Sequence, residues 1–149
     1  KATQEAVFLV QPQAKDYKKV EVDFELYEVF DDSGQSIGYS IPWNANGYQG
    51  NIRVMIGVKK DLKTIVGINV LEQTETPGLG TKIMEEPFTS QFVDLVADPK
   101  AIAVKGLPAS KPGEVQTITG ATISSKAIID IVNGSLEKLR NSELPGAES

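Results

Sequence analysis

Hydroxyl side chains gather in one short stretch of the sequence, Thr119-Gly120-Ala121-Thr122-Ile123-Ser124-Ser125. The β-branched run 115–118 precedes it and predicts a strand. A helix is predicted after it, because apolar residues recur at three- and four-residue steps, at Ile128, Ile131, Val132, Leu136 and Leu139. The first N–H groups of a helix lack partners, and the helix dipole favours an anion there. The stretch could therefore bind an anion, with the Thr122 hydroxyl in the first turn and Gly120 and Ala121 leaving space for a bulky ligand.

A simpler role for these hydroxyl groups is also open, because Thr119 or Thr122 could merely cap the helix. A second stretch, Glu75-Thr76-Pro77-Gly78-Leu79-Gly80, could likewise have a ligand-binding or a purely structural role. Its Pro77-Gly78 pair suits the central positions of a type II turn. The glycines would let the backbone approach a flat ligand, with Leu79 as an apolar contact. The stretch could equally be a tight turn and nothing more.

Together, the two stretches resemble the signatures of one family of FMN-binding domains. The family includes the G subunit of the Rnf electron-transport complex and the C subunit of the sodium-pumping quinone reductase. The two stretches occur in the family's order, and the segment 47–50 followed by a strand is similar to the start of that domain. The resemblance covers roughly residues 45–135 and implies that residues 1–149 are a single FMN-binding domain.

In this family the last Thr of the hydroxyl stretch forms a phosphoester with FMN, which implies Thr122 as the covalent acceptor. Residues 119–125 would hold the phosphate end, residues 75–80 would form a wall, and Glu75 could hydrogen-bond near the flavin. Trp43, Tyr48 and Leu79 are predicted ring contacts, although Trp43 and Tyr48 could instead be packing residues. The predicted cofactor-binding residues are Tyr48, Glu75, Thr76, Leu79, Gly80, Thr119, Gly120, Ala121, Thr122, Ile123 and Ser124. No catalytic residue and no metal ligand is predicted.

One position departs from the family pattern. The family usually carries an Asp three residues before the Ser or Thr that opens the attachment motif, and this chain has Gln116 there. That Asp is thought to help a flavin transferase recognise or orient its target. Gln keeps the length and some hydrogen bonding but lacks the charge, so the substitution leaves the efficiency of flavin attachment open.

Composition excludes several classes of protein. The chain has 149 residues, no Cys and no His, which excludes disulfides, thiolate nucleophiles, Cys-ligated iron–sulfur clusters and His-dependent triads. A net charge of −5 argues against a nucleic-acid partner. A carboxylate metal site or glycosidase pair among Glu72, Glu75, Glu85 and Glu86 is disfavoured, because scattered acids are usually solvated. Any chemistry is therefore expected to come from a bound cofactor.

The expected elements position these motifs. A half-buried strand at 20–30, a turn at 31–34 and a strand at 36–41 form one predicted hairpin, and 52–58 with 64–71 form a second. A helix is expected from Pro87 to about residue 96, a short strand at 101–105 and a loop at 107–113. The run 6–10 is either a strand or the end of a helix, and the end from Leu144 is expected to fray. The predicted fold is α+β, with a largely antiparallel, twisted sheet of hairpins, helices packed on it and a C-terminal helix after the attachment motif.

The resemblance implies a flavoprotein electron carrier with covalent FMN, without turnover of its own, in an ion-translocating Rnf-type membrane complex. Its partners would be the other subunits and a flavin transferase, and FMN would be absent from protein made without that enzyme. No apolar run in this chain is long enough to span a bilayer. Members of the family begin with one membrane-spanning helix, so the resemblance implies an N-terminal membrane helix outside this chain and a domain on the extracytoplasmic, periplasmic side. The alternatives are a non-redox ligand-binding or interaction module and a free-standing FMN-dependent reductase. Membership of the quinone-reductase system also stays open.

Overall fold

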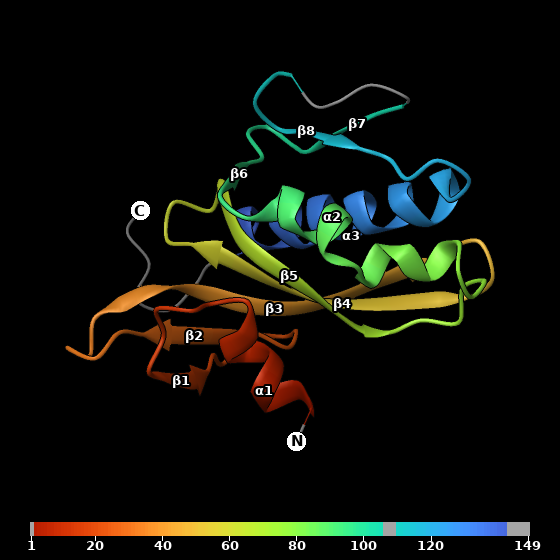
Figure 1. The fold of residues 1–149 in the computed structure, drawn as a ribbon. Coiled ribbons are helices and arrows are strands. Elements are labelled where there is room, and N and C mark those ends of the chain that lie inside the picture. Colours follow the sequence, from red (N-terminus) through yellow and green to blue (C-terminus); the bar gives the residue numbers. More distant parts are fainter. Residues whose placement is uncertain (1, 106–109, 143–149) are drawn as a thin grey trace.

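The computed structural model describes residues 2–105 and 110–142. Six strands form one antiparallel sheet in chain order (Figure 1). They are β1 (Asp16–Lys19), β2 (Tyr27–Phe30), β3 (Ser36–Asn46), β4 (Asn51–Lys59), β5 (Thr64–Glu72) and β6 (Leu95–Val96). Two further strands, β7 (Ile102–Val104) and β8 (Glu114–Gln116), form a separate parallel pair. The helices are α1 (Ala2–Leu9), η1 (Gly80–Met84), α2 (Glu86–Thr89), η2 (Ser90–Phe92) and α3 (Thr122–Arg140). No helix in the described ranges has the length and apolarity needed to cross a membrane.

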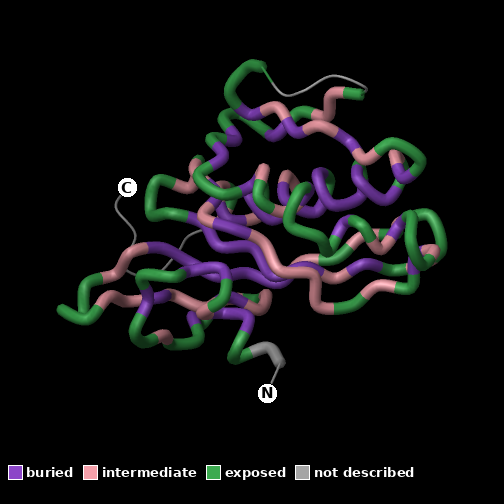
Figure 2. The backbone as a smooth tube through the Cα atoms, in the orientation of Figure 1, coloured by how far each residue is buried: buried purple, intermediate pink, exposed green. Residues whose placement is uncertain are grey.

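Helices cover both faces of the sheet (Figure 1). Strand β4 lies at its centre, and its side chains alternate between two cores, as a pleated strand requires. Ile52, Val54 and Ile56 enter the larger core under α3, whereas Met55 enters the smaller core beneath α1. All four side chains are fully buried, so β4 lies in the purple centre of the tube in Figure 2. The predicted α+β class with a largely antiparallel sheet is confirmed.

The C-terminal helix is confirmed as the longest helix of the described chain. Its five predicted apolar positions are all completely buried in the larger core. Both predicted hairpins also form, since β2 pairs with β3 and β4 pairs with β5. These elements hold the hydroxyl stretch at the start of α3 and the second stretch just after β5.

The strand predicted over residues 20–30 is wrong in its first seven residues. Only Tyr27–Phe30 forms a strand, and its partner β1 was not predicted. Before it, the Val20 N–H donates to Leu26 O over 2.9 Å, and the Val22 N–H donates to Val20 O. These local bonds turn the chain back on itself. The alternating apolar residues nevertheless pack on the larger core. Their alternation therefore reflects the burial of a loop, and it does not indicate a strand.

The helix predicted from Pro87 to residue 96 is too long. The helical segments α2 and η2 end at Phe92, and Leu95 and Val96 pair with β5. Asp94 between them has a φ of 60°, a left-handed conformation that ends a helix. The apolar run 6–10 is helical through Leu9, and the strand expected at 101–105 is β7. Residues 110–113 of the loop expected at 107–113 belong to no helix or strand, whereas residues 107–109 and the end expected to fray from Leu144 lie outside the described residues.

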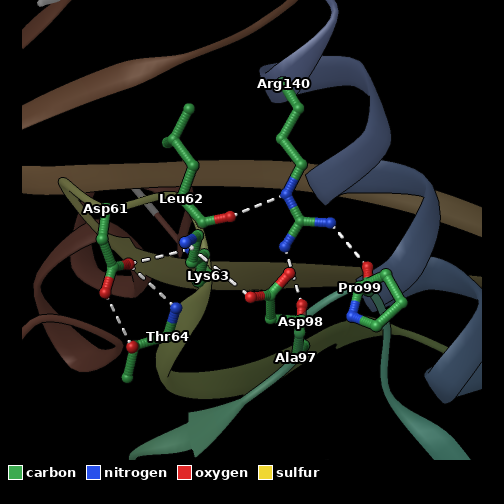
Figure 3. Close-up of polar contacts among 8 residues, drawn as sticks. All are labelled: Asp61, Leu62, Lys63, Thr64, Ala97, Asp98, Pro99 and Arg140. Atoms are coloured by element: carbon green, nitrogen blue, oxygen red, sulfur yellow. Dashed lines mark hydrogen bonds and ion pairs between the residues drawn. The ribbon is translucent and has the colours of Figure 1, made fainter.

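Arg140 ties the far end of α3 to two loops. Its guanidinium donates to three backbone carbonyls: Leu62 over 2.8 Å, Ala97 over 2.7 Å and Pro99 over 2.6 Å (Figure 3). The peptide bond between Asp98 and Pro99 is cis. The rigid fork of an arginine suits several acceptors at once, so this one side chain joins α3, the β4–β5 turn and the 97–99 loop.

Replacing Arg140 by methionine is expected to lower the free energy of unfolding by about 2 kcal/mol, because three charge-assisted hydrogen bonds are lost and the carbonyls regain water only in part. Urea unfolding measures the difference. Arg140→Lys is the matched control. It keeps the charge, but one ammonium group cannot donate to all three carbonyls, so this variant should recover only a minor share of the stability lost in Arg140→Met. Equal unfolding midpoints for Arg140→Met and the wild type would show that these bonds do not stabilise the fold.

Candidate functional site

A pocket of about 400 Å³ opens at the end of the sheet where α3 begins. Three segments meet there: the β3–β4 loop, the turn after β5 and the start of α3 (Figure 1). Its lining residues are Tyr48, Thr76, Leu79, Gly80, Gly120, Ala121, Thr122, Ile123 and Ser124. Tyr48, Leu79 and Ile123 are 66%, 47% and 55% exposed. A pocket of this size with exposed apolar side chains and a few polar groups is typical of a small-molecule site.

The turn after β5 has the geometry that its sequence predicts. The Leu79 N–H donates to Thr76 O over 3.1 Å, and Gly78 has a φ of 81°, as the third position of a type II turn requires. The backbone at Gly80 lies very close to Glu75 and Ser124. A Cβ atom there would lie 2.5 Å from Glu75 Cβ and 3.1 Å from Ser124 Oγ. The absence of a side chain at Gly80 therefore allows the turn to pack against the start of α3.

No side chain caps the start of α3. Ala121 occupies the position before the first helical residue, and no side chain of residues 2–105 or 110–142 forms a capping hydrogen bond there. The interpretation of Thr119 or Thr122 as a plain helix cap is therefore wrong. Helix geometry leaves the N–H groups of Thr122, Ile123 and Ser124 without partners inside the helix. All three residues line the pocket, so this wall can bind an anion.

The hydroxyl residues of the motif have separate roles. Ser125 is fully buried, and its Oγ donates to Ala121 O over 2.8 Å and accepts from the Ile118 N–H over 2.9 Å. Ser124 is also buried, and its Oγ donates to the Glu75 carboxylate. Thr122 is half-buried and lines the pocket, and none of the hydrogen bonds found within residues 2–105 and 110–142 uses its hydroxyl. Thr122 is thus the hydroxyl of this motif that lines the pocket without a hydrogen-bond partner among the described residues.

Glu75 lies directly behind the pocket wall and is 3% exposed. Its Oε1 accepts from the Tyr48 N–H over 2.7 Å and from Ser124 Oγ over 2.5 Å, and its Oε2 accepts from the Gln49 N–H over 2.8 Å. Burial raises the pKa of this carboxyl, but hydrogen bonds from the Ser124 hydroxyl and neighbouring backbone N–H groups outweigh it. The pKa therefore lies below its ordinary value, and Glu75 is an anion at neutral pH.

The sequence profile described as the FMN-binding domain matches residues 47–137 of this chain. The chain belongs to the FMN-binding domain family. Every residue that lines the pocket falls inside the matched segment. The family match and the pocket therefore concern the same part of the fold.

Two relatives are similar to this chain along most of its length. The G subunit of the ion-translocating oxidoreductase complex of Methanosarcina acetivorans is 37% identical over 142 residues, which cover 89% of this chain and 72% of that protein. The G subunit of the Na⁺-translocating ferredoxin:NAD⁺ oxidoreductase complex of Acetobacterium woodii is 34% identical and covers 86% of this chain and 65% of that protein. The chain therefore spans about two thirds to three quarters of these relatives.

The fold also matches that of a solved structure. The crystal structure of NqrC from Shewanella oneidensis superposes with a TM-score of 0.69 at 21% sequence identity, over 89% of this chain and 74% of that one. At this identity the comparison supports the fold alone. It supports the curved antiparallel sheet with its C-terminal helix.

Nine of the eleven residues predicted to bind the cofactor line the pocket of this FMN-binding fold. Glu75 lies behind the wall, and Thr119 faces a neighbouring hollow of about 220 Å³ that Gln116 also lines. Trp43 does not line the pocket, because its indole packs beside Gly134 in the middle of α3. The prediction that Trp43 contacts the flavin ring is therefore wrong.

Gln49 was not predicted, although the segment that contains it was. Its N–H donates to Glu75, and its side-chain amide donates to Thr76 Oγ1 over 3.3 Å. The only sequence signal was the likeness of residues 47–50 to the start of the family domain. The Gln116 backbone N–H and C=O pair with the Gln91 side chain over 2.7 and 3.0 Å. Gln91 thereby fixes β8 beside η2, just before the attachment motif.

Proposed function

We propose that this domain is a flavoprotein electron carrier that holds FMN in the pocket at the start of α3. The observation that carries the proposal is the start of α3, where no described side chain caps the helix and the Thr122 hydroxyl has no partner among the described residues, beside exposed apolar side chains and within the segment that matches the FMN-binding family. When bound, FMN supplies reversible one- or two-electron transfer, which a chain without Cys and His cannot perform with its own side chains.

The pocket suits the two ends of FMN. The N–H groups of Thr122, Ile123 and Ser124 can stabilise the phosphate charge, helped by the helix dipole. Tyr48 and Leu79 offer an aromatic and an apolar surface to the flat ring, and covering such surface is worth roughly 25 cal/mol per Å². Gly120 has a φ of 84°, which a residue with a side chain rarely adopts, and its missing Cβ keeps the wall open beside Leu79.

Thr122 is the proposed covalent acceptor. A flavin transferase would bring an activated flavin nucleotide, such as flavin adenine dinucleotide, to the pocket. Thr122 Oγ1 would form a new bond to the FMN phosphorus, the pyrophosphate bond to AMP would break, and the hydroxyl proton would leave with AMP or solvent. The phosphoester keeps one negative charge, which the N–H groups of the α3 start can stabilise.

The proposed setting is an Rnf-type membrane complex that moves ions while it transfers electrons. The names of the two relatives support this, because both are G subunits of ion-translocating oxidoreductase complexes. The proposal includes the other subunits as partners. It also includes an extracytoplasmic, periplasmic location with a membrane anchor elsewhere in the full protein, as the family resemblance implies.

The reaction of the isolated flavinylated chain with electron donors tests this function. The chain, co-expressed with a flavin transferase, should stay yellow through denaturing dialysis, be reduced by dithionite and be reoxidised by ferricyanide without loss of flavin. NADH alone should not sustain turnover with a soluble acceptor. Steady NADH-driven turnover would instead indicate a free-standing FMN-dependent reductase. A colourless product under conditions that modify a related domain would indicate a non-redox module.

A further inference from the structure

The β3–β4 loop folds around the Glu75 carboxylate. The Gly47 N–H donates to Gly50 O over 2.7 Å and closes the loop. Inside it, the successive N–H groups of Tyr48 and Gln49 both donate to the carboxylate of Glu75, over 2.7 and 2.8 Å. Successive N–H groups that converge in this way form an anion-binding nest. A side chain of the same chain fills this nest, so the loop that carries Tyr48 is fastened to the turn after β5.

The same carboxylate reaches the start of α3. Ser124 Oγ donates to Glu75 Oε1 over 2.5 Å, and Ser124 is one of the first helical residues. The space around the carboxylate is full: a Cβ atom on Gly47 would lie 2.6 Å from Glu75 Oε1, and one on Gly80 would lie 2.5 Å from Glu75 Cβ. One buried anion therefore joins the three segments that line the pocket.

An amide cannot replace this carboxylate without loss. A carboxylate offers two acceptor oxygens, whereas glutamine offers one oxygen and an NH₂ group that would face N–H donors. The part-buried N–H groups of Tyr48 and Gln49 would cost free energy if they lost their acceptor. Glutamine at position 75 would therefore release part of the loop that carries Tyr48 while keeping the shape and length of the side chain.

We propose that Glu75 is a positioning residue of the flavin site, which fixes the Tyr48 ring and the first turn of α3 relative to the turn at 76–80. This inference rests on the proposed function, because it concerns the flavin held in that pocket. Glu75 does not line the pocket and acts through the backbone of Tyr48 and the hydroxyl of Ser124. It thereby sets how tightly the flavin ring is held against an aromatic neighbour.

Fluorescence and visible circular dichroism of the attached flavin test this role in four chains: wild type, Glu75→Gln, Tyr48→Ala and the double variant. An aromatic ring in contact with a flavin quenches its emission. Glu75→Gln should brighten the flavin several-fold and weaken its dichroism, as Tyr48→Ala does, and the double variant should match Tyr48→Ala alone because both changes act through one contact. Glu72→Gln, at an exposed glutamate three residues away, should leave both signals unchanged.

Two results would overturn the inference. One is a Glu75→Gln signal equal to that of the wild type, and the other is a double variant whose change is the full sum of the two single changes. If Glu75→Gln does not fold, Ser124→Ala removes one donor only and should shift both signals in the same direction by a smaller amount, and no shift there also overturns it. Intact mass of the wild-type chain is measured first. A wild type that gains no flavin contradicts the proposed function itself, whereas a modified wild type leaves the role of Glu75 to be decided by the variants.

Discussion

A chain with Thr122→Val should gain no flavin mass when it is co-expressed with a flavin transferase, whereas the wild type should gain the mass of FMN less one water. Valine has nearly the shape of threonine and the same β-branching, so the start of α3 should stay intact. What it lacks is the oxygen that would bond to phosphorus. Intact-mass spectrometry measures the gain, and the expected effect is complete loss.

Thr122→Ser is the matched control for this change. Serine keeps the hydroxyl at the same place in the first turn, so some attachment should remain. Unfolding midpoints of all three chains should be similar, because Thr122 is half-buried and its hydroxyl has no partner among the described residues. A flavin gain in Thr122→Val equal to that of the wild type would exclude Thr122 as the acceptor.

Gly80→Ala should deform the pocket and destabilise the fold. The new Cβ would lie 2.5 Å from Glu75 Cβ, an atom next to the backbone that cannot swing aside. The turn must therefore separate from the start of α3, and overpacking of this kind costs about 1–3 kcal/mol. Urea unfolding measures the stability, and titration of the unmodified chain with free FMN measures the affinity. The free energy of FMN binding should weaken by at least as much as the free energy of unfolding.

Gly78→Asn separates this steric effect from a backbone effect. Gly78 also lies in the turn and has a φ of 81°, but a Cβ there would meet no atom of the described chain within 4 Å. Asn tolerates this left-handed conformation better than most residues. It should therefore lose little stability and keep its FMN affinity. Equal losses in Gly78→Asn and Gly80→Ala would mean that close packing at Gly80 does not shape the pocket.

Long, strongly periodic segments could be predicted from the sequence. Helix α3 has five apolar residues at helical spacing, and all five are fully buried. Strands β4 and β5 could be predicted as a hairpin because a turn separates two β-branched runs. In each case the local pattern and the tertiary packing favour the same element.

The secondary structure of two segments could not be predicted, because a periodic pattern indicates which side chains are buried and not which backbone groups form hydrogen bonds. Residues 20–26 alternate like a strand, but the backbone N–H groups of Val20 and Val22 donate to carbonyls within the same segment. Residues 93–96 continue a helical spacing, but Asp94 turns the chain and Leu95 joins the sheet. Local hydrogen bonds decided the first outcome, and the pairing of Leu95 with Ile65 on β5 decided the second.

The candidate site could be predicted as a set of motifs but not as a geometry. The order of the two motifs indicated which segments meet, and most of their residues do line one pocket. The orientation of Glu75 toward the loop at 47–50 depends on how three segments pack. The outward position of Thr119 depends on the turn at Gly120. Neither follows from residue type or spacing.

Attachment of flavin at Thr122, and at no other hydroxyl, is open to a decisive test by peptide mapping of the flavinylated chain. Trypsin cuts after Lys105 and Lys126 but not between Lys111 and Pro112, so one peptide, 106–126, carries the motif. Its hydroxyl residues are Ser110, Thr117, Thr119, Thr122, Ser124 and Ser125.

Electron-transfer fragmentation of this peptide assigns the added mass to one residue. The whole mass step should fall between Ala121 and Ile123. A step at Thr119 would move the attachment to the neighbouring hollow that Gln116 lines. A step at Ser124 would require the bond to Glu75 to break. Either result, or a flavin found on another peptide, would contradict the assignment of this pocket and of Thr122 as the acceptor.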